Sequence, residues 1–290
     1  NVTSLIGSKE GIHNIHLAYV NPGDVVLYPD PRYPVYRISP AFCGGLPYSM
    51  PLKKENAFLP DFDVIPGDIA KRAKIIWLNY PNNPTAATAE RAFYKEAMEF
   101  AQDNNIIVCS DEAYSAITFD GYSAPSLLEV DGVMELGIVF NSLSKTYNMT
   151  GWRIGYAVGS PEIIKSLVKL KSNVDSGTCR FIQEAGITAL TSPQNCVRES
   201  IKIYQARRDT LVKGLSDMGF SVDVPKATFY MWMEVPENDS MAFAKKLLEA
   251  GVVVTPGVGF GEHGEGYVRL ALTQPEERIK EALKRMENVV

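Results

Sequence analysis

The stretch NSLSKTYNMTGWRIGYAVG, residues 141–159, decides between two interpretations of this chain. It holds one lysine, Lys145, among hydroxyl side chains, and Arg153 follows eight residues later. Apolar runs typical of strands flank the lysine, GIVF at 137–140 and IGYAVG at 154–159. Most lysines in loops are simply solvated. A lysine at the mouth of a buried sheet could instead react with a carbonyl, and the other motifs distinguish these two interpretations.

Strand-like and helix-like segments alternate over the first two-thirds of the chain. The apolar runs are VVLYP (25–29), KIIWLNYP (74–81) and IIVCSDEAY (106–114), and a helical pattern over 90–105 separates the last two. Near-continuous apolar strands separated by helices indicate parallel strands that are buried on both faces. The sequence therefore predicts an α/β fold with a mainly parallel sheet, in a large domain over residues 1–195.

The pattern changes near residue 195, where a long amphipathic helix is predicted to begin. Strand-like runs follow, among them FSVDV (220–224), VVVTP (252–256) and YVRLALT (267–273), with helical segments between and after them. This succession predicts a smaller C-terminal α+β domain over residues 196–290.

The composition argues against several classes of function. A net charge of −5 provides no basic surface for nucleic acid or an anionic membrane, and no apolar run is long enough to cross a bilayer. The four cysteines form no Cys-x-x-Cys pair, and the three histidines lack a further ligand nearby, so no metal site is predicted. Reduced thiols and a cytoplasmic location are expected.

Polar side chains follow the predicted strands, where ligands bind in open α/β sheets. Asn83 lies in a loop fixed by two prolines, either as a donor or as part of a plain turn. Asp111 ends a buried strand, and Tyr114 comes three residues later. A carboxylate in that place needs a cation or a protonated nitrogen, unless it caps a helix.

A second set of residues suits an anion. Ser142 and Arg153 offer a hydroxyl and a guanidinium fork for a phosphate. The segment Gly7-Ser8-Lys9 precedes a predicted helix, whose N-terminal amides could bind the same anion. Gly-Ser-Lys lacks the spacing of a nucleotide P-loop and is weak evidence by itself.

Two further residues fit a flat, charged ligand. Tyr33, between prolines in DPRYPVY, either packs in the core or stacks on a cofactor ring. Arg269 lies in an apolar strand and needs an anion, either a structural carboxylate or a substrate. Together the candidates supply an amine, a carboxylate, a phenol, an amide, a phosphate site and an aromatic face. Pyridoxal 5′-phosphate uses all six.

These motifs resemble, in order and spacing, the fold-type I aminotransferases of class I and II. The matching stretches are spread along nearly the whole chain: GSKEG, DPRYPVY, YPNNPTAA, DEAYS, SLSKTYNMTGWRIG, TPGVGFG and GYVRLALT. The resemblance implies a pyridoxal-phosphate-dependent homodimer that transfers an amino group between an L-amino acid and a 2-oxo acid. Its partners would be these small molecules, with no nucleic acid and no membrane.

The resemblance also assigns roles to residues. Lys145 would hold the cofactor as the internal aldimine and move protons, and Asp111 would pair with the protonated ring nitrogen. Tyr114 and Asn83 would hydrogen-bond the ring hydroxyl. Arg269, with Asn83 as second partner, would bind the substrate carboxylate.

The remaining assignments concern the ring face and the phosphate. Tyr33 would stack on the ring, and the phosphate would be held by Gly7, Ser8, Lys9, Ser142 and Arg153. One departure is Ala86, which stands where the family usually has glycine after Asn-Pro-Thr. Family members also carry residues upstream of the GSKEG-like segment, so an N-terminal part is expected to be missing.

Several stretches most resemble the bacterial LL-diaminopimelate aminotransferases of lysine biosynthesis. Aspartate, alanine and aromatic aminotransferases share most of these residues, so their substrates stay open. The same motifs are compatible with a pyridoxal-phosphate lyase of the same fold. An inactive transaminase-like binding module or fragment stays open as well.

Overall fold

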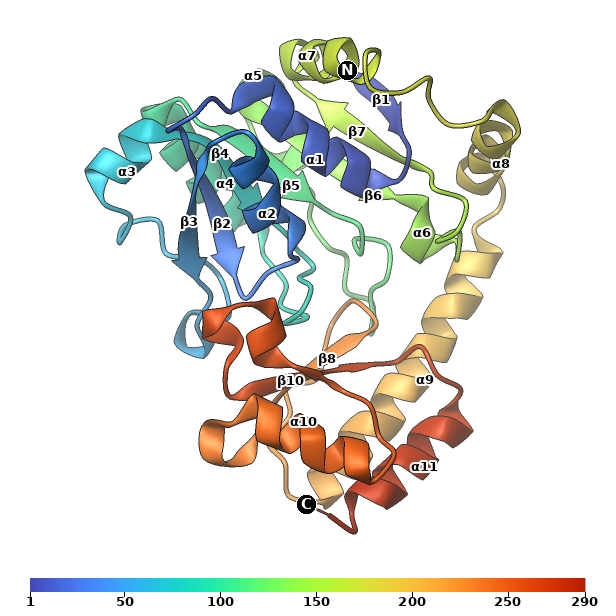
Figure 1. Cartoon of the computed structure of the whole chain (residues 1–290). Helices are drawn as coiled ribbons and strands as arrows, with labels where there is room; N and C mark the ends of the chain where they lie inside the picture. Colours follow the sequence, from blue (N-terminus) through green and yellow to red (C-terminus); the bar gives the residue numbers. More distant parts are fainter. Residues whose placement is uncertain (290) are drawn as a thin grey trace.

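Two β-sheets organise the computed structural model, which describes residues 1–289 (Figure 1). The larger sheet has the strand order β1-β7-β6-β5-β4-β2-β3. Its strands are β1 (Val2–Leu5), β2 (Val25–Asp30), β3 (Leu46–Pro51), β4 (Ala73–Leu78), β5 (Ile107–Asp111), β6 (Gly137–Ser142) and β7 (Gly155–Gly159). Strands β2 to β6 pair in parallel, and β7 pairs antiparallel with β6 and with β1. The predicted α/β fold with a mainly parallel sheet is confirmed.

Helices cover both faces of this sheet, as its apolar strands require. One face carries α1 (Ser8–Tyr19), α2 (Val35–Phe42) and α7 (Pro161–Lys171), and the other carries α3 (Gly67–Arg72), α4 (Arg91–Asn104) and α5 (Val133–Leu136). The chain also forms α6 (Leu143–Thr146), α8 (Arg180–Thr191) and the 3-10 turns η1 (Lys54–Asn56) and η2 (Leu127–Glu129).

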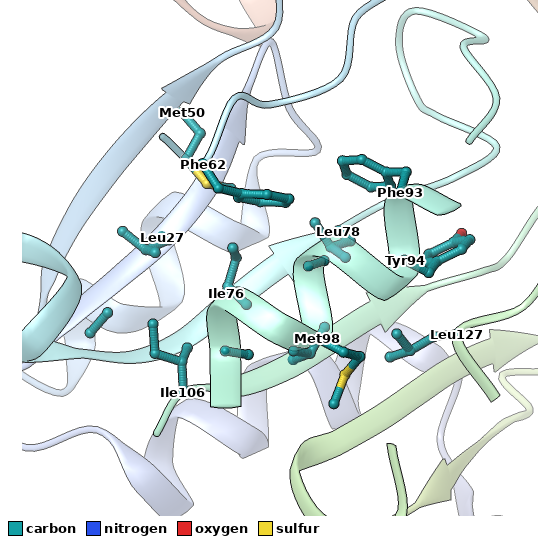
Figure 2. Close-up of a cluster of buried hydrophobic side chains, with 14 of the residues drawn as sticks. Leu27, Met50, Phe62, Ile76, Leu78, Phe93, Tyr94, Met98, Ile106 and Leu127 are labelled. Carbon is teal, nitrogen blue, oxygen red and sulfur yellow. The ribbon is translucent and has the colours of Figure 1, made fainter. Parts of the chain in front are cut away.

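The two cores on either face follow from the period of two along each strand. In β4, Ile76 and Leu78 enter the core beneath α4, where Figure 2 shows them with Phe93 and Met98. Trp77, between them in sequence, enters the opposite core with the helices α1, α2 and α7. Each inner strand therefore contributes to both cores, and the sheet is fixed between two layers of helices.

The smaller sheet is antiparallel, in the order β8-β10-β9. Its elements are β8 (Tyr230–Glu234), η3 (Pro236–Asn238), α10 (Ser240–Glu249), β9 (Thr255–Pro256), η4 (Gly257–Phe260), η5 (Glu262–Gly264), β10 (Tyr267–Ala271) and α11 (Glu276–Met286). The long helix α9 (Asn195–Asp217) runs from the upper part of the molecule to lie beside α11 (Figure 1). It begins at the predicted domain boundary; the division into domains at that residue stays a prediction.

Two predicted strands differ from the structure. The run FSVDV (220–224) forms no strand, and VVVTP (252–256) pairs only through Thr255 and Pro256. Val224 and Val253 are 53% and 82% exposed, so neither valine is buried in the core as a strand residue of the smaller sheet would be. Strand propensity depends on such a partner, which the sequence pattern does not supply.

A segment after β5 joins the two parts of the molecule. Tyr114, Ile117 and Phe119 belong to the core of the smaller sheet, although β5 belongs to the larger one. Thr118 forms a bridge with Ala227 just before β8. The end of β5 is thereby held between the two sheets. Within residues 1–289, no helix is long and apolar enough to cross a membrane.

Candidate active site

A cavity of about 370 Å³ lies between the carboxyl ends of β4, β5 and β6 and the smaller sheet. Every predicted site residue except Gly7 lines it, and Gly7 directly precedes the lining residue Ser8. The cavity therefore brings together Ser8, Lys9, Tyr33, Asn83, Asp111, Tyr114, Ser142, Lys145, Arg153 and Arg269.

Asp111, the last residue of β5, is buried at the base of this cavity. Its Oδ2 accepts a hydrogen bond from the Tyr36 hydroxyl at 2.7 Å, and its Oδ1 accepts one from the Ala113 amide at 3.3 Å. Burial raises the pKa of Asp111 to about 6, although both hydrogen bonds and the charge of Lys145 oppose the rise. At neutral pH the carboxylate is mostly ionised, and a protonated nitrogen in the cavity would stabilise it.

Lys145 lies on α6, at the end of β6, with its side chain half-buried. Burial lowers its pKa, and the charges of Arg153 and Arg269 add to this effect, whereas Asp111 opposes it. A lowered pKa increases the fraction of neutral amine, which is the nucleophilic form. Lys145 can therefore react with a carbonyl or accept a proton.

The N-terminus of α1 faces Arg153. Gly7 has a φ of 71°, and a Cβ there would overlap the Arg153 guanidinium. Arg153 itself adopts a φ of 55° and donates to the Thr150 carbonyl at 2.9 Å. Ser142 accepts from the Ser144 amide at 3.2 Å, which leaves its hydroxyl proton available. The helix amides, the guanidinium and the hydroxyl can together hold a phosphate.

Arg269 lies in β10 between two aromatic rings. Its guanidinium carbon is 4.1 Å from the centre of the Tyr230 ring and 4.6 Å from that of Phe260. Its Nη1 donates to Asn83 Oδ1 at 2.7 Å, and its buried Nε has no partner among the described residues. None of the carboxylates in residues 1–289 forms an ion pair with it. The arginine is therefore available to bind a carboxylate from outside the chain.

Tyr114 and Tyr33 complete the walls. Burial raises the pKa of Tyr114 well above its usual range, so its hydroxyl remains a donor at neutral pH. That hydroxyl lies 3.4 Å from the Tyr230 hydroxyl. The ring of Tyr33 is half-buried, with Lys9 Nζ 5.6 Å from its centre.

Two residues that hold the site together were not predicted from the sequence. Tyr36 donates to Asp111 and stacks on Trp77, with the ring centres 4.9 Å apart. Asn79 donates to the Asp111 carbonyl at 2.8 Å and accepts from the Asn83 amide at 2.9 Å. The second aromatic of DPRYPVY, and a polar residue directly after β4, were the signals for them.

Ala86, which stands where the family usually has glycine after Asn-Pro-Thr, keeps the backbone conformation of that glycine. Its φ is 59°, a left-handed conformation that glycine adopts without strain and alanine does not. Its amide donates to the Asn82 carbonyl at 3.0 Å, and Asn82 also binds the amide and hydroxyl of Thr85. These bonds hold the loop in the conformation that glycine would favour.

The donor set fits pyridoxal 5′-phosphate. Asp111 would pair with the ring nitrogen, Lys145 lies in the same cavity to react with the aldehyde, and the α1 terminus with Arg153 suits the phosphate. A metal would need a different set, and among the described residues no group of three His, Cys, Asp or Glu side chains is placed to hold one.

Comparison with known proteins gives consistent relationships. A family model described as "Aminotransferase class I and II" matches residues 1–286. The LL-diaminopimelate aminotransferase of Moorella thermoacetica is 53% identical over 291 residues, which span 100% of this chain and 75% of that protein. Among solved structures, a probable N-succinyldiaminopimelate aminotransferase from Thermus thermophilus superposes with a TM-score of 0.94 at 34% identity, covering 100% of this chain and 78% of that one. An aspartate aminotransferase mutant from the same organism gives 0.92 at 31% identity, covering 100% and 76%.

The raised pKa of Asp111 predicts a pH dependence of stability in the cofactor-free chain. The folded protein holds the proton of the Asp111 carboxyl more tightly than the unfolded chain does. The protonated carboxyl therefore contributes stability that is fully present below pH 4 and is lost as the pH rises through about 6. Asp111→Asn has no carboxyl to ionise and avoids this loss. The difference in free energy of unfolding between the variant and the wild type should therefore shift in favour of the variant by about 2–3 kcal/mol from pH 4 to pH 8.

Urea denaturation at both pH values measures this difference. Asp103→Asn, at an exposed carboxylate of α4, is the control and should leave the pH dependence unchanged. An Asp111→Asn effect of equal size at pH 4 and pH 8 would contradict the burial argument.

Proposed function

The chain belongs to the class I and II aminotransferases, and from this we propose that it transfers an amino group from LL-diaminopimelate to 2-oxoglutarate, as a step of lysine biosynthesis. It is a pyridoxal-phosphate-dependent transaminase, whose substrates are amino acids and 2-oxo acids. The choice of amino donor is supported by the 53% identity to the Moorella thermoacetica enzyme, against 31% to the aspartate aminotransferase.

The observation that carries the proposed mechanism is the cavity shared by Lys145, Asp111 and Arg269. The bound cofactor supplies an electron sink for the bonds at the substrate α-carbon. Asp111 keeps a proton on the ring nitrogen, because its ionised carboxylate is buried and needs that positive partner. Tyr36 holds this carboxylate in place through the 2.7 Å hydrogen bond.

Lys145 acts as the base in this proposal. Its Nζ is the group in the cavity that would take the proton from the substrate α-carbon and later release it. Because burial lowers its pKa, the amine can lose a proton within the cavity more easily than a solvated lysine.

Arg269 and Asn83 orient the substrate. The two rings beside Arg269 fix the plane of its guanidinium, which can then bind a carboxylate through two parallel hydrogen bonds. Asn83 gives its Oδ1 to Arg269, so its Nδ2 remains free to donate to a ligand. Tyr33 would lie against the ring of the cofactor, and Tyr114 would hydrogen-bond its ring hydroxyl. The phosphate would be held by Gly7, Ser8, Lys9, Ser142 and Arg153.

We also propose that the protein is a homodimer. The helix α8 buries only Gly186 among its own residues, while Phe181, Ile187 and Leu190 are 70%, 54% and 49% exposed. It lies at the edge of the molecule (Figure 1). Apolar side chains gathered on one exposed helix are typical of an interface.

A cytoplasmic location is part of the same proposal. Cys179 and Cys196 are free and exposed, and thiols of this kind persist in a reducing compartment. Only Cys109 is a fully buried core thiol.

The first test of the function uses single amino donors. The chain loaded with pyridoxal phosphate should lose its visible cofactor absorbance on addition of LL-diaminopimelate and regain it with 2-oxoglutarate. Aspartate, alanine and aromatic amino acids should react much more slowly. Lys145→Ala should bind the cofactor non-covalently and turn over at least about 1,000-fold more slowly, since it lacks the base.

A different donor reacting fastest would overturn the proposed substrate but not the aminotransferase chemistry. Elimination or decarboxylation products in place of a 2-oxo acid would indicate a lyase. Normal turnover by Lys145→Ala would contradict the role of that residue.

Arg269→Ala tests the carboxylate site. Because hydrogen bonds to charged groups contribute about 1.5–3 kcal/mol, we expect kcat/KM to fall roughly 10- to 100-fold. The visible absorbance of the bound cofactor should be unchanged, since Arg269 binds the substrate and not the ring. The variant Arg207→Ala, at another half-buried arginine outside the cavity, is the control. Loss of cofactor from Arg269→Ala would show that the arginine is wrongly assigned.

The dimer proposal is tested by Phe181→Asp. Light scattering should show a mass that falls from twice 32.0 kDa to 32.0 kDa, because the new charge would be buried in the interface. Val253→Asp, at an apolar residue of the smaller part that is also exposed, should leave the mass unchanged. The opposite pattern would place the interface elsewhere.

A further inference from the structure

A buried carboxylate that does not line the cavity joins the two sheets. Asp30, the last residue of β2, is 3% exposed. Its Oδ1 accepts from Arg32 Nη1 at 2.7 Å, and its Oδ2 lies 3.0 Å from His263 Nδ1. His263 belongs to η5, which precedes β10 of the smaller sheet. These three side chains, Asp30, Arg32 and His263, are called the interdomain clasp below.

The loop at residues 260–263, which precedes β10, also contacts the end of β2 through its backbone. The carbonyl of Phe260 accepts from both the amide and the Nη1 of Arg32, at 2.9 and 3.1 Å. Gly261 has a φ of 142°, and a Cβ there would overlap Asp30 Oδ1. A residue with a side chain does not fit between this loop and the carboxylate. Three points along the loop, at residues 260, 261 and 263, are thus held against the end of β2.

The loop held in this way carries one wall of the cavity. The ring of Phe260 lies 4.6 Å from the Arg269 guanidinium and 5.9 Å from the Trp232 ring. Because Arg32 holds the Phe260 carbonyl and Asp30 holds the His263 side chain three residues later, the two residues restrain the loop that carries this ring beside Arg269. Arg32 is followed directly by Tyr33, which lines the same cavity.

We propose that the interdomain clasp is a positioning unit for Arg269: it sets the affinity for the substrate carboxylate and leaves the chemistry at Lys145 unchanged. The proposal rests on the proposed role of Arg269. Asp30 does not line the cavity, and we assign its effect to Phe260, the lining residue whose carbonyl is bound by Arg32, the partner of Asp30. Since Arg32 alone still neutralises Asp30 when His263 is removed, the histidine can be tested without leaving a buried charge unpaired.

The test compares His263→Ala with His13→Ala. His13 bonds the Ser39 hydroxyl at 2.9 Å, away from the cavity, and it serves as the matched control. We expect His263→Ala to raise KM for both the amino donor and the 2-oxo acid on the order of 10-fold, the size of a typical coupling between sites. The kcat and the visible absorbance of bound cofactor should stay within about 2-fold of wild type.

A binding measurement separates this proposal from the proposed function. Calorimetric titration of the cofactor-loaded wild type and His263→Ala with 2-oxoglutarate reports carboxylate affinity without turnover. The dissociation constant should rise by the same factor as KM. If LL-diaminopimelate is not the donor, the proposed substrate fails while this titration still tests the clasp.

Two further variants keep the result specific. His263→Asn retains a side-chain N–H donor and should recover much of the lost affinity. In a Phe260→Ala background, His263→Ala should add little, because the ring through which it acts is gone. Additive effects in that background, or an equal fall of kcat with unchanged KM, would overturn the proposal.

Discussion

The ionised carboxylate of Asp111, buried at the end of a parallel strand, is the constraint on which the rest of the site depends. Burial raises its pKa to about 6, and the hydrogen bonds that it accepts come from neutral donors, Tyr36 and Ala113. The negative charge of Asp111 therefore has no hydrogen-bonded cationic partner among the described residues, and the cavity is where such a partner can bind. In the proposed mechanism the protonated ring nitrogen of the cofactor supplies this positive charge, so one contact would serve both cofactor binding and the chemistry.

The site is made by both sheets, and neither sheet could form it alone. The larger one delivers Asp111 and Lys145 at the ends of β5 and β6, where parallel strands place their carboxyl termini together. The smaller one delivers Arg269, whose orientation depends on Asn83 from the larger part. Because Tyr114 follows closely after Asp111 but packs in the core of the smaller sheet, one continuous stretch of chain links the two sheets at the cavity.

The sequence allowed the fold class and ten of the residues that line the cavity to be predicted, since buried parallel strands have long apolar runs and polar residues directly follow them in sequence. It could not reveal contacts that depend on packing. In the sequence, Tyr36 cannot be told from an aromatic residue that only packs in the core. Its hydrogen bond to Asp111 becomes visible only in the folded chain. Asp30 and His263 are 233 residues apart, and only the folded chain brings them together. The run at 220–224 has strand propensity but no neighbouring strand, a fact that lies outside the run itself.

Trp232 gives the molecule an optical property of its own. It stands directly opposite Arg269 in the register of β8 and β10, so both side chains project from the same face of the sheet. Its indole stacks on Tyr267 at 5.2 Å and meets the edge of Phe260. Trp77 is buried in the core between the larger sheet and the helices α1, α2 and α7, and Trp152 is exposed to solvent. The protein therefore contains a natural fluorophore on the same face of the smaller sheet as Arg269, and through Phe260 its indole shares a neighbour with that guanidinium.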